Sequence, residues 1–275
     1  SWAVLTAGNV GSQSGVAYFF ANALARELAG TGPGGIDVPV GVLELAIGGT
    51  STEAFIPATA LASNAYLNAA FEDPRGVRTL GQWTTGRITT NLGSYEHTDP
   101  ALPHPHPYAP GFLYWTGVEN IVPFAFKGAI WYQGESNAEF TNNGYKWNGD
   151  RLSDYQTDVM TTLVDSWRTA FQKPNFPIYM VQLPLISAPN RVKWHWYREA
   201  QNRAAQERDG VEAAVAIEHG EAGDVHPGNK EPVGERLACI ARNKLYGEGN
   251  PYSGPAYTSH RIVGTKIVLR FEHIE

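Results

Sequence analysis

Short apolar runs alternate with longer amphipathic segments along most of the chain, and this alternation limits the folds open to it. The apolar runs are each short enough for one β-strand and cover residues 38–47, 128–132, 178–183 and 211–217. Helical patterns lie before, between and after them, at residues 14–28, 118–124, 150–171, 194–208 and 232–246. Strands that alternate with helices pair in parallel, because each helix returns the chain to the same edge of the sheet. The sequence therefore predicts an α/β fold with a central parallel sheet and helices on both faces.

Polar or glycine-rich segments follow three of the predicted strands, at residues 48–53, 133–137 and 223–227. Between them these segments carry amides, carboxylates, hydroxyl groups and a histidine. In an open parallel sheet, ligands bind beyond the carboxyl ends of the strands, where neighbouring loops meet. We therefore expect the three segments to converge on one site.

The composition excludes several classes of partner. The chain has 275 residues, of which 43% are hydrophobic, enough to bury a substantial core. Its formal net charge is −6 and no run of Lys or Arg occurs, so we expect no nucleic acid and no anionic membrane as partner. No apolar run approaches the roughly 18 residues that a membrane span needs. The eight Trp and thirteen Tyr suit a neutral ligand such as a sugar, because exposed aromatic rings stack on sugar rings.

Asp224 and His226 form the first candidate catalytic pair. Side chains two positions apart in an extended segment point to the same side, so the carboxylate can pair with the imidazole. A paired imidazole can act as a general base near neutral pH. Because the pair follows a predicted strand and faces two other polar segments, we interpret His226 as catalytic.

Gly48, Gly49 and Gln133 are the candidate oxyanion and substrate-binding residues. The two glycines follow the run at 38–47, and without side chains their backbone amides can approach a ligand closely. Gln133 follows the run at 128–132 and adds a side-chain amide. Converging N–H donors of this kind form an oxyanion hole, which stabilises the charge that develops during acyl transfer.

The nucleophile of such a reaction is harder to place. Residues 134–138 imitate the Gly-x-Ser-x-Gly elbow of α/β-hydrolases, with Ser136 as its serine. That elbow needs a helix immediately after the serine, whereas the sequence of residues 141–149 is typical of a loop. Ser14 precedes a helical pattern and is expected to be its N-cap. We therefore favour neither serine, and an α/β-hydrolase that uses Ser136 remains an alternative.

Residues 91–111 carry five prolines together with His97, His104 and His106. This density of proline excludes regular structure and predicts a surface loop near the site. The histidines lack a Cys or carboxylate cluster at ligand spacing, so no metal site is expected there. Near the end of the chain, residues 265–271 alternate between polar and apolar side chains, which predicts a separate β element.

Four groups of residues together carry a specific family pattern. They are WYQGESNA at 131–138, GGT at 48–50 with EAF at 53–55, DVHPGNK at 224–230 and VGERLA at 233–238. This set resembles the sialate O-acetylesterase family, a branch of the SGNH hydrolases related to the acetylxylan esterases. The resemblance implies a three-layer, flavodoxin-like fold and no metal or organic cofactor. It also implies an acetylated carbohydrate as substrate, whose O-acetyl esters are hydrolysed through an acyl-serine.

The resemblance leaves two candidates for the acid that orients His226. The usual SGNH pattern places an Asp three residues before the His, where this chain has Gly223, while Asp224 lies two residues before it. Related acetylxylan esterases use the Glu of a Gln-Gly-Glu motif, which corresponds to Glu135. We keep both acids and expect Glu135 to matter more, because a strand end holds it while Asp224 lies in a turn between Gly and Pro.

In this family the nucleophilic serine lies in a Gly-Gln-Ser-Asn block on the first strand, upstream of the segment that Ser14–Leu28 matches. No residues of this chain match that block, so we expect the nucleophile to lie outside the chain. Residues 1–260 are then an SGNH-type esterase domain without this block, and residues 261–275 begin a β-rich accessory element. An upstream signal peptide would imply a secreted, periplasmic or lysosomal-type location. The alternative to an esterase is a non-catalytic relative that holds a glycan in the same cleft.

Overall fold

A computed structural model describes residues 3–6, 8–72, 107, 110–139, 150–189, 191 and 193–273. The chain divides into two compact units. The larger unit is Leu43–Pro227, and the smaller one combines Ser1–Val42 with Gly228–Glu275. Every candidate site residue named above lies in the larger unit except Ser14.

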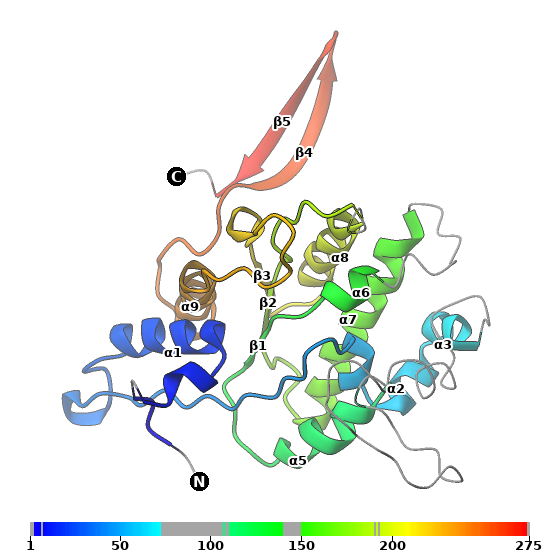
Figure 1. Ribbon diagram of the computed structural model, residues 1–275. Helices are drawn as coiled ribbons and strands as arrows, with labels where there is room; N and C mark the ends of the chain where they lie inside the picture. The colour runs from blue at the N-terminus through cyan, green and yellow to red at the C-terminus, as the bar shows by residue number, and fades with distance from the viewer. Residues whose placement is uncertain are drawn as a thin grey trace, which may run out of the picture. The chain divides into compact units, whose positions relative to one another are not determined.

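The larger unit is built on a parallel sheet whose strands stand in the order β1-β2-β3 (Figure 1). Its strands are β1 (Ala129–Trp131), β2 (Ile178–Val181) and β3 (Val211–Ala214). Ala129 pairs with Ile178, and Ile178 pairs with Val211, so the three strands start in register. All four residues of the central strand β2 are buried, as expected for a strand with helices against the sheet.

Two long helices of the larger unit, α7 (Asp150–Ala170) and α8 (Trp194–Glu207), pack against each other beside the sheet (Figure 1). Shorter helical elements lie in the segments that connect the strands and the long helices. They are η3 (Thr52–Phe55), α2 (Ala58–Ser63), α3 (Ala65–Glu72), the π-helix η4 (Tyr114–Val118), α5 (Glu119–Ile121), α6 (Glu135–Glu139) and η6 (Ile217–His219).

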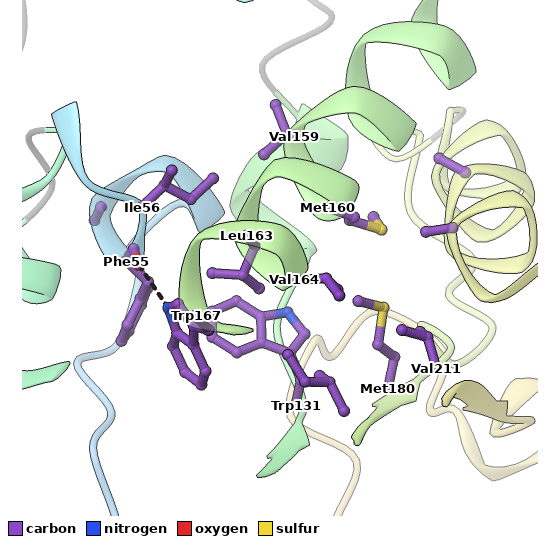
Figure 2. Close-up of a cluster of buried hydrophobic side chains, with 14 of the residues drawn as sticks. Phe55, Ile56, Trp131, Val159, Met160, Leu163, Val164, Trp167, Met180 and Val211 are labelled. Carbon is purple, nitrogen blue, oxygen red and sulfur yellow. Dashed lines mark hydrogen bonds between the residues drawn. The ribbon is translucent and has the colours of Figure 1, made fainter. Parts of the chain in front are cut away.

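The core between α7 and the sheet holds a group of edge-to-face aromatic rings (Figure 2). Trp131 of β1 meets Phe55 at a ring distance of 5.0 Å and Trp167 at 5.8 Å, both nearly perpendicular. Trp167 Nε1 also donates a hydrogen bond to the carbonyl oxygen of Phe55 at 2.9 Å. These contacts fasten the η3 segment to α7 and to the end of β1, which bear the polar residues of the site.

The smaller unit pairs α1 (Gly15–Glu27) with α9 (Glu231–Tyr246) and also contains η1 (Val10–Ser12) and η2 (Pro33–Gly35). A Cβ on Gly234 would lie 2.6 Å from the backbone of Phe20, so glycine permits the close approach of the two helices. The unit ends in an antiparallel hairpin of β4 (Ala256–Val263) and β5 (Lys266–Glu272), whose side chains are almost all exposed.

The parallel α/β architecture predicted from the sequence is confirmed. Ser14 caps α1 as expected, since its hydroxyl oxygen accepts the Ala17 N–H at 3.3 Å. The tail also forms the predicted β element, although β4 already begins at Ala256, so the expected boundary after residue 260 falls inside a strand. The helix expected over 118–124 is shorter, because α5 ends at Ile121.

The strand predicted over residues 38–47 is wrong. The structure gives these residues no strand pairing, and Val38 and Leu43 are 37% and 39% exposed. An apolar, β-branched run becomes a strand only where a neighbouring strand offers hydrogen bonds, so its side chains alone do not decide. The Gly48-Gly49 segment therefore does not end a strand of the described sheet.

Candidate active site

The chain leaves β1 at Gly134, whose backbone φ of 149° lies in the region that favours glycine. The ring of Tyr197 from α8 fills the space where a side chain at this position would lie. The chain therefore turns at one defined point, with Gln133 before it and Glu135 after it.

A short helix follows this turn, contrary to the expectation of a loop after Ser136. Helix α6 begins at Glu135, and an acidic residue in the first helical turn is favourable because it faces unpaired backbone N–H groups. Residues 141–149, on which the loop prediction rested, lie outside the described residues. The Ser136 hydroxyl donates to the carbonyl oxygen of Gly49 at 2.9 Å. Within the described part of the chain, no histidine hydrogen-bonds to it.

Gly48 and Gly49 form an exposed turn. Gly49 has a φ of 80°, and the Thr50 hydroxyl closes the turn by donating to the Ile47 carbonyl oxygen at 2.8 Å. A Cβ on Gly48 would meet none of the atoms around it within 4 Å. No surrounding atom therefore occupies the space beside the Cα atom of Gly48.

Gln133 ties that turn to the end of β1. Its Nε2 donates to the Thr50 carbonyl oxygen at 3.0 Å and to Asn137 Oδ1 at 2.7 Å. Its Oε1 accepts the Thr52 hydroxyl at 2.6 Å and, more weakly, the Tyr197 hydroxyl at 3.4 Å. Both amide hydrogens are engaged, so Gln133 could donate to an oxyanion only by giving up one of these bonds.

A buried polar cluster lies behind the turn. Asn137 is fully buried, and its Nδ2 donates to Glu53 Oε2 at 2.9 Å and to Gln156 Oε1 at 3.1 Å. Glu53 is also fully buried and accepts the Tyr155 hydroxyl at 2.9 Å. Asn137 Oδ1 accepts the backbone N–H of Thr52 at 2.9 Å. The cluster therefore joins η3, α6 and α7 behind the exposed turn.

Sequence reasoning passed over Tyr155, Gln156 and Tyr197, and it used Glu53 only as part of the polar segment and of the family pattern. A signal was present for two of them. Tyr155 and Gln156 each stand four residues before a core residue of α7, Val159 and Met160, so they are polar groups on its apolar face. Polar groups at such positions must find buried partners, which marks them as members of a network.

Asp224 and His226 pair as their spacing predicted. Asp224 Oδ1 accepts the backbone N–H of His226 at 2.8 Å and lies 3.4 Å from His226 Nδ1. The preceding Gly223 has a φ of 79°, which turns the chain into this arrangement. The His226 side chain is 87% exposed. Because the carboxylate lies beside Nδ1, Nε2 is the ring nitrogen left to meet a reactant.

The charge of Glu135 acts on two tyrosines and one arginine near it. Burial raises the pKa of Tyr132 and of Tyr197, and the charge of Glu135 raises both further, so the two phenols stay protonated. Burial lowers the pKa of the Arg191 guanidinium, and the charge of Glu135 opposes that effect. The carboxylate whose contact with His226 the structure gives is Asp224.

The sequence also led us to expect no metal site and no membrane-spanning segment. Among the described residues, no three His, Cys, Asp or Glu side chains stand close enough together to hold a metal ion. His97, His104 and His106 lie outside the described residues. None of the helices that the structure describes has the length and hydropathy needed to cross a membrane.

Comparison with known proteins agrees with the motifs. Residues 113–239, which include β1, Gln133 to Asn137 and the Asp224–His226 pair, match the family described as carbohydrate esterase, sialic acid-specific acetylesterase. This part of the chain is similar to that family. The resemblance read from the sequence motifs is thereby confirmed.

Relatives and a solved structure point the same way. The chain is 26% identical over 284 residues to the sialate O-acetylesterase of Mus musculus, covering 93% of this chain and 48% of the relative. It is 23% identical over 217 residues to the sialate O-acetylesterase of Homo sapiens, covering 70% and 39%. A crystal structure of a carbohydrate acetylesterase from Xanthomonas citri superimposes with a TM-score of 0.73 at 28% identity, over 98% of this chain and 50% of that one. The chain thus spans about half the length of these proteins.

Proposed function

We propose that this chain carries the general base and the oxyanion-binding turn of a carbohydrate O-acetylesterase, a carboxylic ester hydrolase. The reaction is the hydrolysis of O-acetyl esters on sugars through an acyl-serine. The observation that carries the proposal is the Asp224–His226 pair, in which the carboxylate faces Nδ1 and leaves Nε2 for the reaction. The match of residues 113–239 to sialic acid-specific acetylesterases supports the acetylated sugar as substrate.

His226 takes the proton of the attacking serine hydroxyl and returns it to the sugar oxygen that leaves. A carboxylate beside Nδ1 holds the tautomer that has its free lone pair on Nε2, and it stabilises the imidazolium that forms. Asp224 Oδ1 lies 3.4 Å from Nδ1, which supports Asp224 in this role. Glu135 is the alternative acid that could orient His226. Its other possible role is to contribute its negative charge to the electrostatic field around the reacting ester from the start of α6.

The turn at Gly48 and Gly49 supplies the oxyanion donors. Backbone N–H groups stabilise the charge on the tetrahedral intermediate without needing to reorganise during the reaction. The open space at Gly48 lets the acetyl carbonyl approach, and Gln133 holds the turn through the Thr50 carbonyl oxygen. Gln133 therefore holds the oxyanion-binding turn in place. It donates to the oxyanion itself only if its hydrogen bond to the Thr50 carbonyl oxygen breaks.

No step of this reaction calls for a metal or an organic cofactor. The nucleophile is a serine, and Ser136 is a second candidate for it because α6 follows the Gly134 turn directly. Against Ser136 stands the bond from its hydroxyl to Gly49, which directs the proton to a carbonyl oxygen and not to a base.

Covalent labelling separates the possibilities. The full-length protein is treated with a serine-directed phosphonate, the modified peptide is identified by mass spectrometry, and hydrolysis of p-nitrophenyl acetate is followed in parallel. We expect one labelled serine other than Ser136 together with loss of hydrolysis. A label on Ser136 would indicate the α/β-hydrolase mechanism, while no label and no hydrolysis would indicate a carbohydrate-binding relative.

A further inference from the structure

We propose that Glu53 is a positioning residue, whose buried carboxylate sets the orientation of the Asn137 and Gln133 amides and so fixes the Gly48-Gly49 turn. Its catalytic consequence rests on the proposed esterase function. The orientation itself is a property of the fold and can be tested without activity.

The argument begins with what a carboxylate can do. Glu53 is fully buried, and its two oxygens accept hydrogen bonds from Asn137 Nδ2 and from the Tyr155 hydroxyl, both at 2.9 Å. Both oxygens of the Glu53 carboxyl group accept hydrogen bonds, so the atom of Asn137 that faces it is the nitrogen. Glu53 therefore determines which way the Asn137 amide points.

The orientation of Asn137 then determines that of Gln133. With Nδ2 toward Glu53, Asn137 Oδ1 faces the opposite way and accepts the N–H of Thr52 at 2.9 Å and Gln133 Nε2 at 2.7 Å. Because Oδ1 only accepts, Gln133 must present its nitrogen and not its oxygen. The second hydrogen of Gln133 Nε2 then reaches the Thr50 carbonyl oxygen at 3.0 Å.

Glu53, Asn137 and Gln133 thus form a series of hydrogen bonds, here called the relay, that runs from the interior to the turn. In this relay each group fixes which atom of the next group is the donor. At its outer end the relay reaches the carbonyl oxygen of Thr50, which directly follows Gly49, and the N–H of Thr52, two residues further along. If the Asn137 amide were reversed, its nitrogen would face two donors, the Thr52 N–H and Gln133 Nε2, and both bonds would be lost. The side chain at position 53 thus controls the position of a turn that it does not touch.

The chemistry of Glu53 argues against a role in stability alone. Among the described residues, none of the ion pairs includes Glu53, and both of its partners are neutral. Burying a carboxyl group beside neutral partners alone is costly, because the group gives up its contacts with water. An apolar side chain would suit the core better. The orientation of Asn137, however, requires an acceptor at position 53, and the Glu53 carboxyl group supplies it.

The test exchanges the two partners. Asn137→Asp puts a carboxylate oxygen against Glu53 Oε2, so two acceptors face each other across a 2.9 Å contact. Glu53→Gln combined with Asn137→Asp restores a donor facing an acceptor, with the donor now on position 53. The Gln156 amide must reverse and donate as well, because Gln156 Oε1 accepts from Asn137 Nδ2 in the unmodified protein. The second oxygen at position 137 still accepts the Thr52 N–H and Gln133 Nε2. Val164→Ala, a fully buried truncation on α7, is the matched control for lost stability.

We expect Asn137→Asp to lower the kcat for p-nitrophenyl acetate by about tenfold or more, with KM changed by less than about threefold, since the turn acts mainly on the transition state. The double variant should recover most of kcat and most of the loss in Tm. Val164→Ala should lower Tm and keep kcat. If Asn137→Asp does not fold, a folded double variant with nearly normal Tm and kcat supports the relay.

Two outcomes would overturn the proposal. A double variant no better than Asn137→Asp in Tm shows that Glu53 does not set the amide orientation. Recovery of Tm without recovery of kcat shows that the orientation has no catalytic role. If the unmodified full-length protein hydrolyses no acetyl ester, the proposed function fails, while the comparison of Tm values still decides the orientation of Asn137.

Discussion

Gly134 and the ring of Tyr197 compete for the same space: a Cβ on Gly134 would lie 2.2 Å from Tyr197 Cε1. Tyr197 is fully buried in α8, so its ring has no free volume to move into. Its hydroxyl also reaches Gln133 Oε1 at 3.4 Å. The position of α8 therefore dictates where the chain leaves β1 and how the residues on either side of Gly134 are placed.

Gly134→Ala should destabilise the protein by about 3 kcal/mol, because it combines overpacking against a buried ring with an unfavourable backbone φ. Urea unfolding followed by circular dichroism measures this. The control is Gly249→Ala, where a Cβ would meet nothing within 4 Å, and it should change stability by less than about 0.5 kcal/mol. Equal effects of the two changes would show that the Gly134–Tyr197 contact does not constrain the turn.

His226→Ala should lower the kcat for p-nitrophenyl acetate by at least about a hundredfold, since it removes the general base. The fold should persist, because the side chain is 87% exposed. His195→Ala, an exposed histidine on α8, is the control and should leave kcat unchanged. Near-normal turnover of His226→Ala, with an unchanged circular dichroism spectrum, would remove His226 from the mechanism.

Asp224→Asn should lower kcat by about a hundredfold or more, because an uncharged partner no longer supports the imidazolium. Glu135→Gln should cost less than about tenfold if it acts only through its field. This ranking reverses the one expected from the sequence, and the reason is the 3.4 Å contact between Asp224 and His226 Nδ1. The kcat values of the two folded variants decide it, and a larger loss in Glu135→Gln would make Glu135 the orienting acid.

Ser136→Ala should keep kcat within about fivefold of the unmodified protein, because the change removes one neutral hydrogen bond to the Gly49 carbonyl oxygen. Steady-state hydrolysis of p-nitrophenyl acetate measures it. Complete loss of hydrolysis, with the phosphonate adduct mapped to position 136, would make Ser136 the nucleophile.

The elements that followed from the sequence are those whose pattern is local. The helices α7, α8 and α9 lie within about two residues of their predicted bounds, because the period of 3.6 residues in their apolar side chains is a property of each segment alone. The three strands of the sheet followed from short apolar runs in the same way. The Asp224–His226 pair also followed, since two residues in one turn need no distant partner.

Other features depended on partners that the sequence does not place. Residues 38–47 have the composition of a strand and no strand beside them, and α6 forms where a loop was expected. The sequence could suggest that Gln133 is polar and near a ligand, but not that both its amide hydrogens are engaged.

Tertiary structure alone decided the buried network. Glu53 meets Asn137 across 84 positions and Tyr155 across 102 positions of the chain, and no local pattern relates them. The sequence by itself determined the helices α1, α7, α8 and α9, the three parallel strands and which residue types could serve as base and oxyanion donors. The packing of α7 and α8 beside the sheet decided which of those residues meet, because a buried polar group is satisfied only by the partner that the fold brings within hydrogen-bond distance.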